Sequence, residues 1–266
     1  MKKSAAIIFS LCTVAFAATA DDANLLKNGN FARGKTNWVT VGTVAEEANG
    51  GVLTLGGKAN RAISRQVIKV EEGATYKVSA KITSNKRVQI LLGVIPMGRQ
   101  NYEMYYRHSS GAKPETLTEL AEAYVKGSNT VVLKDNPAWK SGNIVFNAKA
   151  DMSDLPNYEI TNFQKFERKD GKIYLTLAKG YKRNFAAGTK VRLHVDGATY
   201  PYLANLRKEF PGAVDAAGTI GKDGKSKFPA GTVGFKTLIL IPGKAVADLK
   251  VEVRDVKVEK VAPAAK

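Results

Sequence analysis

The most constraining feature of this sequence is an alternation of apolar and polar residues in steps of two, which recurs along most of the chain. In residues 75–83 the side chains of Tyr76, Val78, Ala80 and Ile82 fall on one face of an extended chain. Residues 87–95 are almost continuously apolar, which predicts a strand that is covered on both faces. Residues 249–261 alternate again, but the period slips by one residue at Arg254-Asp255, which predicts a β-bulge.

Further strands are expected wherever short apolar or alternating runs are bounded by Gly, Asn, Asp or Pro. Asp170-Gly171 lies between two alternating runs and predicts a hairpin turn. Helical spacing is confined to residues 114–124 and, more weakly, 199–210, so we expect one or two short helices. The fold class is therefore predicted to be all-β. The remaining strand candidates are residues 38–42, 52–55, 65–70, 101–107, 130–133, 143–146, 158–167, 172–177, 190–195 and 235–241.

Residues 1–20 have the pattern of a cleavable secretory signal peptide. Lys2 and Lys3 precede an apolar run over residues 5–17, and Ala18-Thr19-Ala20 provides small residues for cleavage before Asp21. The apolar run is too short for a transmembrane anchor, which needs about 20 residues, and no stop-transfer charges follow it. Cys12 lies inside the apolar run, which argues against a lipoprotein. We therefore expect a secreted, periplasmic or cell-surface protein whose mature chain has no transmembrane segment.

Cleavage would remove the only cysteine of the chain, Cys12. The mature protein would then have no disulfide, no zinc-thiolate site and no cysteine nucleophile. The formal net charge of +17 would fall to +15 with the loss of Lys2 and Lys3. Outside the cytoplasm this charge favours acidic polysaccharides, anionic headgroups or a cell-envelope surface over nucleic acid. The simpler interpretation, that abundant lysine only keeps the protein soluble, stays open.

The segment NLLKNGNFARGKTNW, residues 24–38, resembles the opening of carbohydrate-binding modules of the galactose-binding-like jelly-roll type. Those modules open with an N-L-(L/V)-x-N-G-(D/N)-F-E pattern followed by a Trp, which Trp38 matches and which we expect in the core. The resemblance extends over residues 24–96 and 236–261 and implies a jelly-roll β-sandwich built from the two ends of the mature chain. The middle of the chain is similar to small β modules of phage tail-fibre and surface proteins.

These likenesses predict a divided chain. The expected parts are the signal peptide 1–20, a sandwich from residues 21–100 and 228–261, an inserted β subdomain over residues 101–227 and a tail over residues 262–266. Insertion into a sandwich loop is feasible where the ends of the insert lie close together. Two consecutive domains are the alternative, but the C-terminal strands would then lack a sheet.

The resemblance also implies a structural Ca²⁺, held by oxygens near the N-terminal motif and by an Asp of the last strand. The matching positions are Asn30 and Asp255. Ala32 stands where the family has Glu, which removes one expected ligand.

Aromatic and charged residues gather in residues 102–108, YEMYYRH. Jelly-roll glycan binders place aromatic faces against sugar rings and polar groups at the hydroxyls and carboxylates. On an extended strand Tyr105 and Arg107 would share a face, where they could meet an acidic sugar. The other candidate ligand-binding residues are Trp139, Tyr200 and Tyr202. The competing interpretation is a strand with one core face and one solvated face.

Three classes of function follow from these features. The first is a secreted, non-catalytic carbohydrate-binding or cell-surface protein for acidic glycans. The second is an envelope structural or adhesive protein whose basic face binds acidic polymers. The third is a polysaccharide lyase or glycoside hydrolase, for which the sequence contains only His108 and His194 as imidazoles and no nucleophile or metal-site motif. No catalytic residue is assigned.

Overall fold

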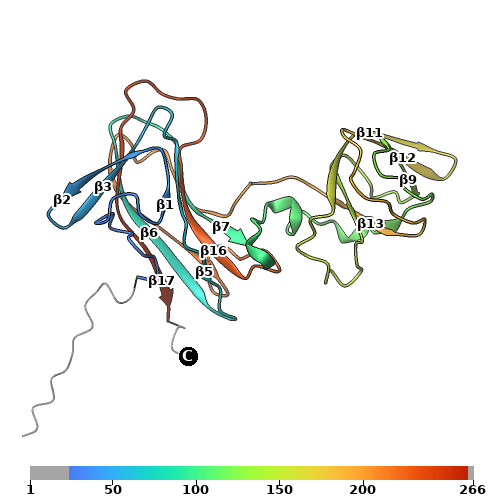
Figure 1. Cartoon of the computed structure of the whole chain (residues 1–266), viewed down its shortest axis with the longest axis horizontal. Helices are drawn as coiled ribbons and strands as arrows, with labels where there is room; N and C mark the ends of the chain where they lie inside the picture. Colours follow the sequence, from blue (N-terminus) through green and yellow to red (C-terminus); the bar gives the residue numbers. More distant parts are fainter. Residues whose placement is uncertain (1–23, 263–266) are drawn as a thin grey trace, which may run out of the picture.

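The computed structural model describes residues 24–262. The expected signal peptide and all of the expected tail except Ala262 lie outside this range. The chain forms two β lobes joined by a narrow connection (Figure 1). The prediction of an all-β protein with a β-sandwich is confirmed, since every strand pair is antiparallel and two sheets pack face to face.

The first lobe is a sandwich of two sheets whose strands come from both ends of the chain. One sheet has the order β1-β4-β16-β7-β14, with β5 paired to β16, and the other has the order β15-β6-β17-β3-β2. The strands of the first sheet are β1 (Trp38–Val39), β4 (Arg61–Ser64), β5 (Ile68–Lys69), β7 (Ile90–Met97), β14 (Tyr202–Leu206) and β16 (Gly234–Leu240). Those of the second are β2 (Thr43–Glu47), β3 (Gly50–Leu55), β6 (Thr75–Ser84), β15 (Gly212–Gly221) and β17 (Val251–Val261).

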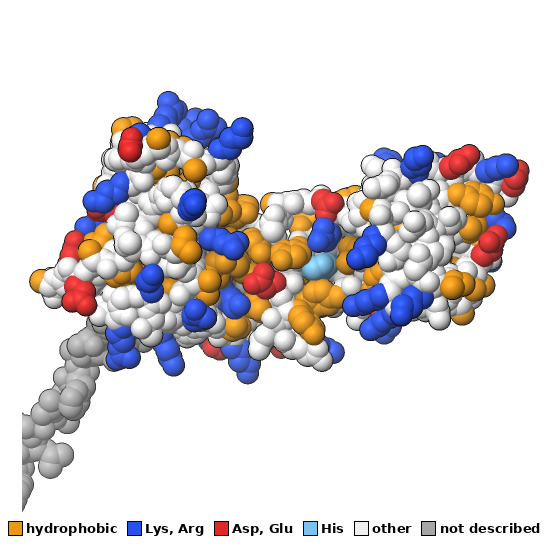
Figure 2. All heavy atoms as spheres, turned by 45° about the horizontal axis from the view of Figure 1, so that its top comes forward, with side chains coloured by type: hydrophobic (Ala, Val, Ile, Leu, Met, Phe, Trp, Pro, Cys, Tyr) orange, Lys and Arg blue, Asp and Glu red, His pale blue; other side chains and the backbone are white. Residues whose placement is uncertain are grey.

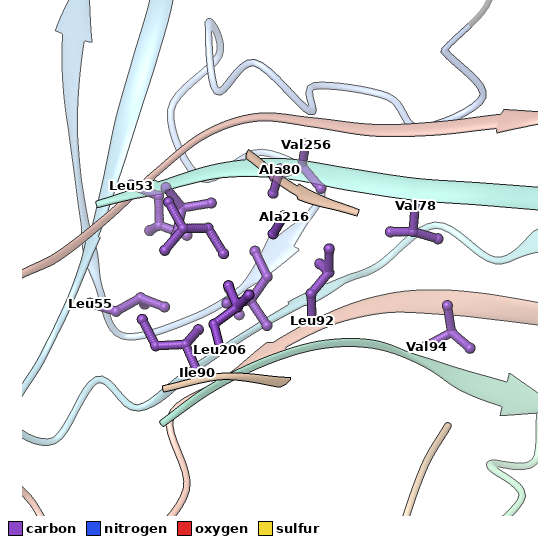
Figure 3. Close-up of a cluster of buried hydrophobic side chains, with 14 of the residues drawn as sticks. Leu53, Leu55, Val78, Ala80, Ile90, Leu92, Val94, Leu206, Ala216 and Val256 are labelled. Carbon is purple, nitrogen blue, oxygen red and sulfur yellow. The ribbon is translucent and has the colours of Figure 1, made fainter. Parts of the chain in front are cut away.

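The core of the sandwich lies between the two sheets. Figure 3 shows Ile90, Leu92 and Val94 of β7 facing side chains of the opposite sheet, including Val78 and Ala80 of β6. Strand β7 is buried along its whole length, and its other face is also covered, as the continuous apolar run predicts. The expected bulge in β17 is present, because its register against β6 shifts between Arg254 and Lys257. The bulge keeps all the β17 valines from Val251 to Val258 in the core.

The second lobe is formed by residues 118–194. Its strands follow the order β8-β13-β10-β11-β12-β9, and a bridge between Leu120 and Leu133 joins the two ends of this path, so the sheet closes into a barrel. The hairpin at Asp170-Gly171 is present, with both residues at positive φ, between β11 and β12. The strands are β8 (Thr118–Glu119), β9 (Thr130–Lys134), β10 (Asn143–Phe146), β11 (Ile160–Lys169), β12 (Lys172–Leu177) and β13 (Lys190–His194).

The observed strand pairing differs from the expected segment boundaries. Strands β14 and β15 lie within the expected insert of residues 101–227, yet they pair with β7 and β6 of the sandwich. The chain therefore returns to the sandwich at Tyr202. Residues 212–221 are rich in Ala and Gly and show little contrast between large apolar and polar residues, so their pattern predicts no strand.

The predictions of helices over residues 114–124 and 199–210 are both wrong. Residues 114–124 contain the 3₁₀ turn η3 (Pro114–Thr116) and strand β8, and Leu120 and Tyr124 then bridge to Leu133 and Phe185 in the barrel. Residues 199–210 contain β14. The strand expected over residues 101–107 is also wrong, because this segment contains the turns η1 (Arg99–Asn101) and η2 (Tyr106–His108).

Candidate functional site

Two segments of the chain connect the lobes. We call them together the waist, which comprises residues 98–117 and 195–201. Figure 2 shows apolar side chains gathered between the two lobes. The waist is held to both lobes by hydrogen bonds. The backbone amide of Asn157 in the barrel donates to the carbonyl of His108 (2.8 Å), and Ser109 Oγ donates to the carbonyl of Ala230 in the sandwich (3.0 Å). These bonds fix the backbone around η2.

A continuous chain of five aromatic rings crosses the waist. Tyr102 packs on Tyr158 with ring centroids 5.7 Å apart, and Tyr158 packs on His108 at 4.7 Å. His108 packs on Tyr105 at 5.3 Å, and Tyr105 packs on Tyr200 at 5.7 Å. All four pairs are tilted, a geometry that is favourable for aromatic rings. The structure therefore brings together two of the predicted binding residues, Tyr105 and Tyr200.

A pocket of about 170 Å³ opens beside Tyr105. The Arg107 guanidinium lies 5.6 Å from the centre of the Tyr105 ring and 3.7 Å from Asp196, an ion pair in which both side chains are substantially exposed. Such a pair contributes little to stability and can be rearranged by a ligand. The pocket is lined by Tyr105, Tyr106, Arg107, Asp196, Gly197 and Thr199.

Gly197 is required by the close approach of the two waist segments. A Cβ atom at this position would lie 2.6 Å from the ring of Tyr106. The absence of a side chain therefore lets Tyr106 pack against the backbone and leaves the adjoining space open.

Tyr200 and Tyr202 lie on the outer face of the first sheet, where they help to cover Ile95 and Met97 of β7. Tyr200 donates a hydrogen bond to Glu103 Oε2 (3.2 Å). Burial and the adjacent Glu103 carboxylate raise the pKa of Tyr200, so its hydroxyl stays protonated and serves as a donor. Tyr202 is half-buried and is held against β7, where Gly93 allows its close approach. It covers the sheet and does not line the pocket at Tyr105.

A buried polar network of the barrel contacts the backbone of η2 at the pocket residue Arg107. The Arg192 guanidinium pairs with Asp154 (2.7 Å), although the two side chains are only 1% and 5% exposed. Arg192 Nε donates to His194 Nε2 (3.1 Å), so the other ring nitrogen, Nδ1, carries the proton and donates to the carbonyl of Arg107 (2.6 Å). Through His194, the network positions the backbone of a pocket residue.

Burial lowers the pKa of both His108 and His194 to about 4. Both imidazoles are therefore neutral at neutral pH, as their hydrogen bonds require. Neither lines the pocket. Their positions support a structural role in holding the waist and give no support for proton transfer to a ligand.

We expect the stability of the protein to decrease as pH falls from 6.5 to 4. An unfolded histidine titrates near 6.5, so in this window the unfolded chain binds protons that folded His108 and His194 do not. Their contribution is complete above pH 6.5 and is on the order of 3 kcal/mol each. Urea unfolding across this range measures the slope. The double variant H108Q/H194Q should flatten it, and an unchanged slope in that variant would contradict the assignment.

Trp139 does not belong to the site, which corrects the sequence prediction. Its side chain is 1% exposed in the barrel core, and its Nε1 donates to the carbonyl of Thr116 (2.6 Å). The Pro- and Gly-bounded segment around Trp139 is typical of an exposed turn, but closing the barrel turns the indole inward. Trp38 is buried in the sandwich, as expected.

Asn30 and Asp255 line one cleft of about 480 Å³, so the structure brings the two expected calcium positions together. Their oxygens are nevertheless engaged: Lys81 Nζ lies 3.0 Å from the Asp255 carboxylate, and the Ala32 amide donates to Asn30 Oδ1 (3.2 Å). Lys27 and Lys257 add positive charge to the same cleft. Within residues 24–262 no three His, Cys, Asp or Glu side chains are grouped to hold a metal. The residues present do not fit a calcium ion.

Several residues of the site cannot be found from the sequence. Asp196, Gly197 and Thr199 reach the pocket from a segment about ninety positions away from Tyr105, and no motif marks them. The sequence marks Tyr158 only as the start of an expected strand. The pattern D-G-A-T-Y-P-Y over residues 196–202, with Gly between an acid and aromatics, is the one local signal.

Comparisons with known proteins give only distant likenesses. No family model matches the chain, and no curated protein matches it. Among solved structures, the enzymatically active domain of bacteriophage CBA120 tailspike protein 4 is 9% identical with a TM-score of 0.34, over 90% of this chain and 22% of that one. A "putative sugar binding protein" from Bacteroides thetaiotaomicron VPI-5482 is 12% identical with a TM-score of 0.34, over 90% of this chain and 100% of that one. Scores this low assign no activity.

In the described part of the chain, no helix is long and apolar enough to cross a membrane.

Proposed function

We propose that this protein binds carbohydrate without catalysis and that the waist pocket holds a sugar ring against Tyr105. The observation that carries the proposal is the meeting of an accessible aromatic ring, a guanidinium and a carboxylate in one small pocket. Sugar sites combine an apolar face for ring C–H groups with a few placed polar groups. At about 170 Å³ the pocket suits a single ring.

The Arg107–Asp196 pair offers donors and acceptors in the pocket that the Tyr105 ring also lines. Neighbouring sugar hydroxyls can use both groups, and a uronate carboxylate can displace the exposed Asp196 from Arg107. The net charge, which is +17 for the whole chain and would be +15 after removal of the expected signal peptide, attracts acidic polymers over a longer range. We therefore propose acidic glycans as the preferred class.

The chain of rings extends the site beyond the pocket. Tyr102, at its far end, is 58% exposed although it is aromatic. An exposed ring that packs on Tyr158 at the end of this chain can contact further sugar units of an oligosaccharide. Export through the expected signal peptide is part of the same proposal, because it would place the site where extracellular or envelope glycans occur.

Replacing Tyr105 with Ala is expected to weaken oligosaccharide binding about tenfold or more, since truncating an aromatic anchor commonly costs over 1 kcal/mol. A glycan array identifies the best oligosaccharide, and isothermal titration measures its affinity. Tyr174→Ala, which truncates a half-buried tyrosine of the barrel, is the matched control. Arg107→Gln should weaken a uronate oligosaccharide more than its neutral counterpart. Equal affinities for the Tyr105 and Tyr174 variants would rule out the pocket.

A further inference from the structure

A second concave surface lies on the sandwich, away from the residues that line the waist pocket. It is a cleft of about 690 Å³ bordered by Lys27, Arg33 and Arg65, which we call the cationic cleft. Its other lining side chains are neutral: Asn28, Asn30, Ala32, Thr36 and Asn37. Three positive charges therefore face one cleft whose lining includes no acid.

The backbone beneath the three cations is held by a dense set of hydrogen bonds. The Lys27 amide donates to Gln66 Oε1 (2.8 Å), the Arg33 amide donates to Asn28 Oδ1 (2.9 Å), and the Arg65 amide donates to the Asn37 carbonyl (2.7 Å). All three cationic positions are therefore fixed within one framework.

Asn28 and Asn37 are the centres of this framework. Both adopt positive φ, which asparagine tolerates better than most residues. Asn28 Nδ2 donates to the carbonyls of Gly34 (3.1 Å) and Thr36 (2.6 Å), and Asn37 Nδ2 donates to the carbonyl of Lys27 (2.8 Å). The side-chain amides of Asn28 and Asn37 therefore hold the loop in shape. The charged side chains of Lys27, Arg33 and Arg65 are not needed for these bonds and can contact a ligand.

The three cations have no carboxylate partner among residues 24–262. Thirteen ion pairs form within this range, and none involves Lys27, Arg33 or Arg65. Like charges that line one cleft repel one another, and an anion in the cleft would relieve this repulsion.

We infer that the cationic cleft binds an acidic polysaccharide through its carboxylate or sulfate groups. The cleft adjoins the one that contains Asp255, with which it shares Lys27, Asn28 and Asn30, so its ligand can be extended. Its lining contains no aromatic ring on which a nucleobase could stack, which favours a polysaccharide over a single-stranded nucleic acid. The cationic cleft and the waist pocket have no lining residue in common.

The double variant R33Q/R65Q tests the inference, with K35Q/K58Q as its charge-matched control. Lys35 belongs to the same loop but does not line the cleft, and Lys58 lies in a different loop. The probes are a long oligogalacturonate, its methyl-esterified form, inorganic sulfate and a single-stranded DNA of similar charge. Isothermal titration with the full chain at low and moderate salt gives the affinities, and thermal melting checks that the variants remain folded.

R33Q/R65Q should weaken oligogalacturonate binding about tenfold and K35Q/K58Q less than twofold, while the affinity for the methyl ester should be the same in R33Q/R65Q as in the unaltered protein. The effect should be the same in a Tyr105→Ala background, which separates this cleft from the waist site. If both double variants lost the same affinity for oligogalacturonate, binding would depend on net charge alone, and the cationic cleft would not be the binding site. Binding of sulfate as tight as the oligomer, or binding of DNA through the same two arginines, would overturn the polysaccharide assignment.

Discussion

Replacing Asp154 with Ala is expected to destabilise the barrel by about 3–5 kcal/mol, which is the cost of leaving a buried charge without its partner. Arg192 is almost inaccessible, and Asp154 is its only carboxylate partner within residues 24–262. Burial acts to raise the pKa of Asp154, but hydrogen bonds from Asn157 and Arg192 outweigh it and hold the pKa below its ordinary value. The carboxylate is therefore charged in the folded protein, and its removal leaves Arg192 uncompensated.

Asp151→Ala is the matched control, because Asp151 belongs to the same loop but is exposed. Its side chain accepts a hydrogen bond from the Ser153 amide (3.0 Å), so we expect a loss of at most about 1 kcal/mol. The two tryptophans report on the lobes separately, since Trp38 lies in the sandwich core and Trp139 in the barrel core. Urea unfolding followed by ¹⁹F NMR of 5-fluorotryptophan should show an earlier transition at Trp139 in the Asp154 variant. Similar losses for Asp151→Ala and Asp154→Ala would contradict this prediction.

Replacing Gly29 with Ala is expected to cost about 3 kcal/mol in the sandwich, because the new methyl group would overlap backbone atoms. A Cβ atom at Gly29 would lie 2.0 Å from the carbonyl oxygen of Val256. The Val256 amide also donates to the Gly29 carbonyl (2.9 Å), so the N-terminal segment is bound to the bulge of β17. The clash can be relieved only if the two segments move apart.

Gly34→Ala provides the comparison within the same loop. A Cβ atom at Gly34 would have no neighbouring atom within 4 Å, and only the positive φ of 57° disfavours a side chain there. We expect a loss of about 1 kcal/mol in this variant, visible at Trp38 and not at Trp139. A Gly29 variant that is no less stable than the Gly34 variant would show that β17 and the N-terminal segment are not held together in this way.

Sequence pattern predicts best the elements that depend on local alternation. Strands β10 and β12 begin and end where the apolar runs do, and the slipped period at Arg254-Asp255 locates the bulge of β17. The pattern fails where long-range pairing dominates. Leu120 and Tyr124 have helical spacing, but bridges to Leu133 and Phe185 place both in strand-like segments of the barrel.

The sequence predicts that Tyr105 and Arg107 lie close together, but the structure brings them together in a different way. The sequence predicts that Tyr105 and Arg107 share the face of a strand. They lie together because a 3₁₀ turn places the guanidinium 5.6 Å from the ring centre. Asp196 and Gly197 arrive from the second waist segment, and their proximity depends on how the barrel is joined to the sandwich. No local pattern encodes that junction.

The most direct test of a sugar site at the waist is an NMR titration of the ¹⁵N-labelled protein with the best oligosaccharide from the glycan array. We predict that the largest chemical-shift changes occur at the amides of Tyr105, Arg107 and Gly197, and that they are lost in Tyr105→Ala. Changes confined to the residues of the cationic cleft or to other parts of the sandwich, with the waist amides unaffected, would contradict the assignment of the pocket.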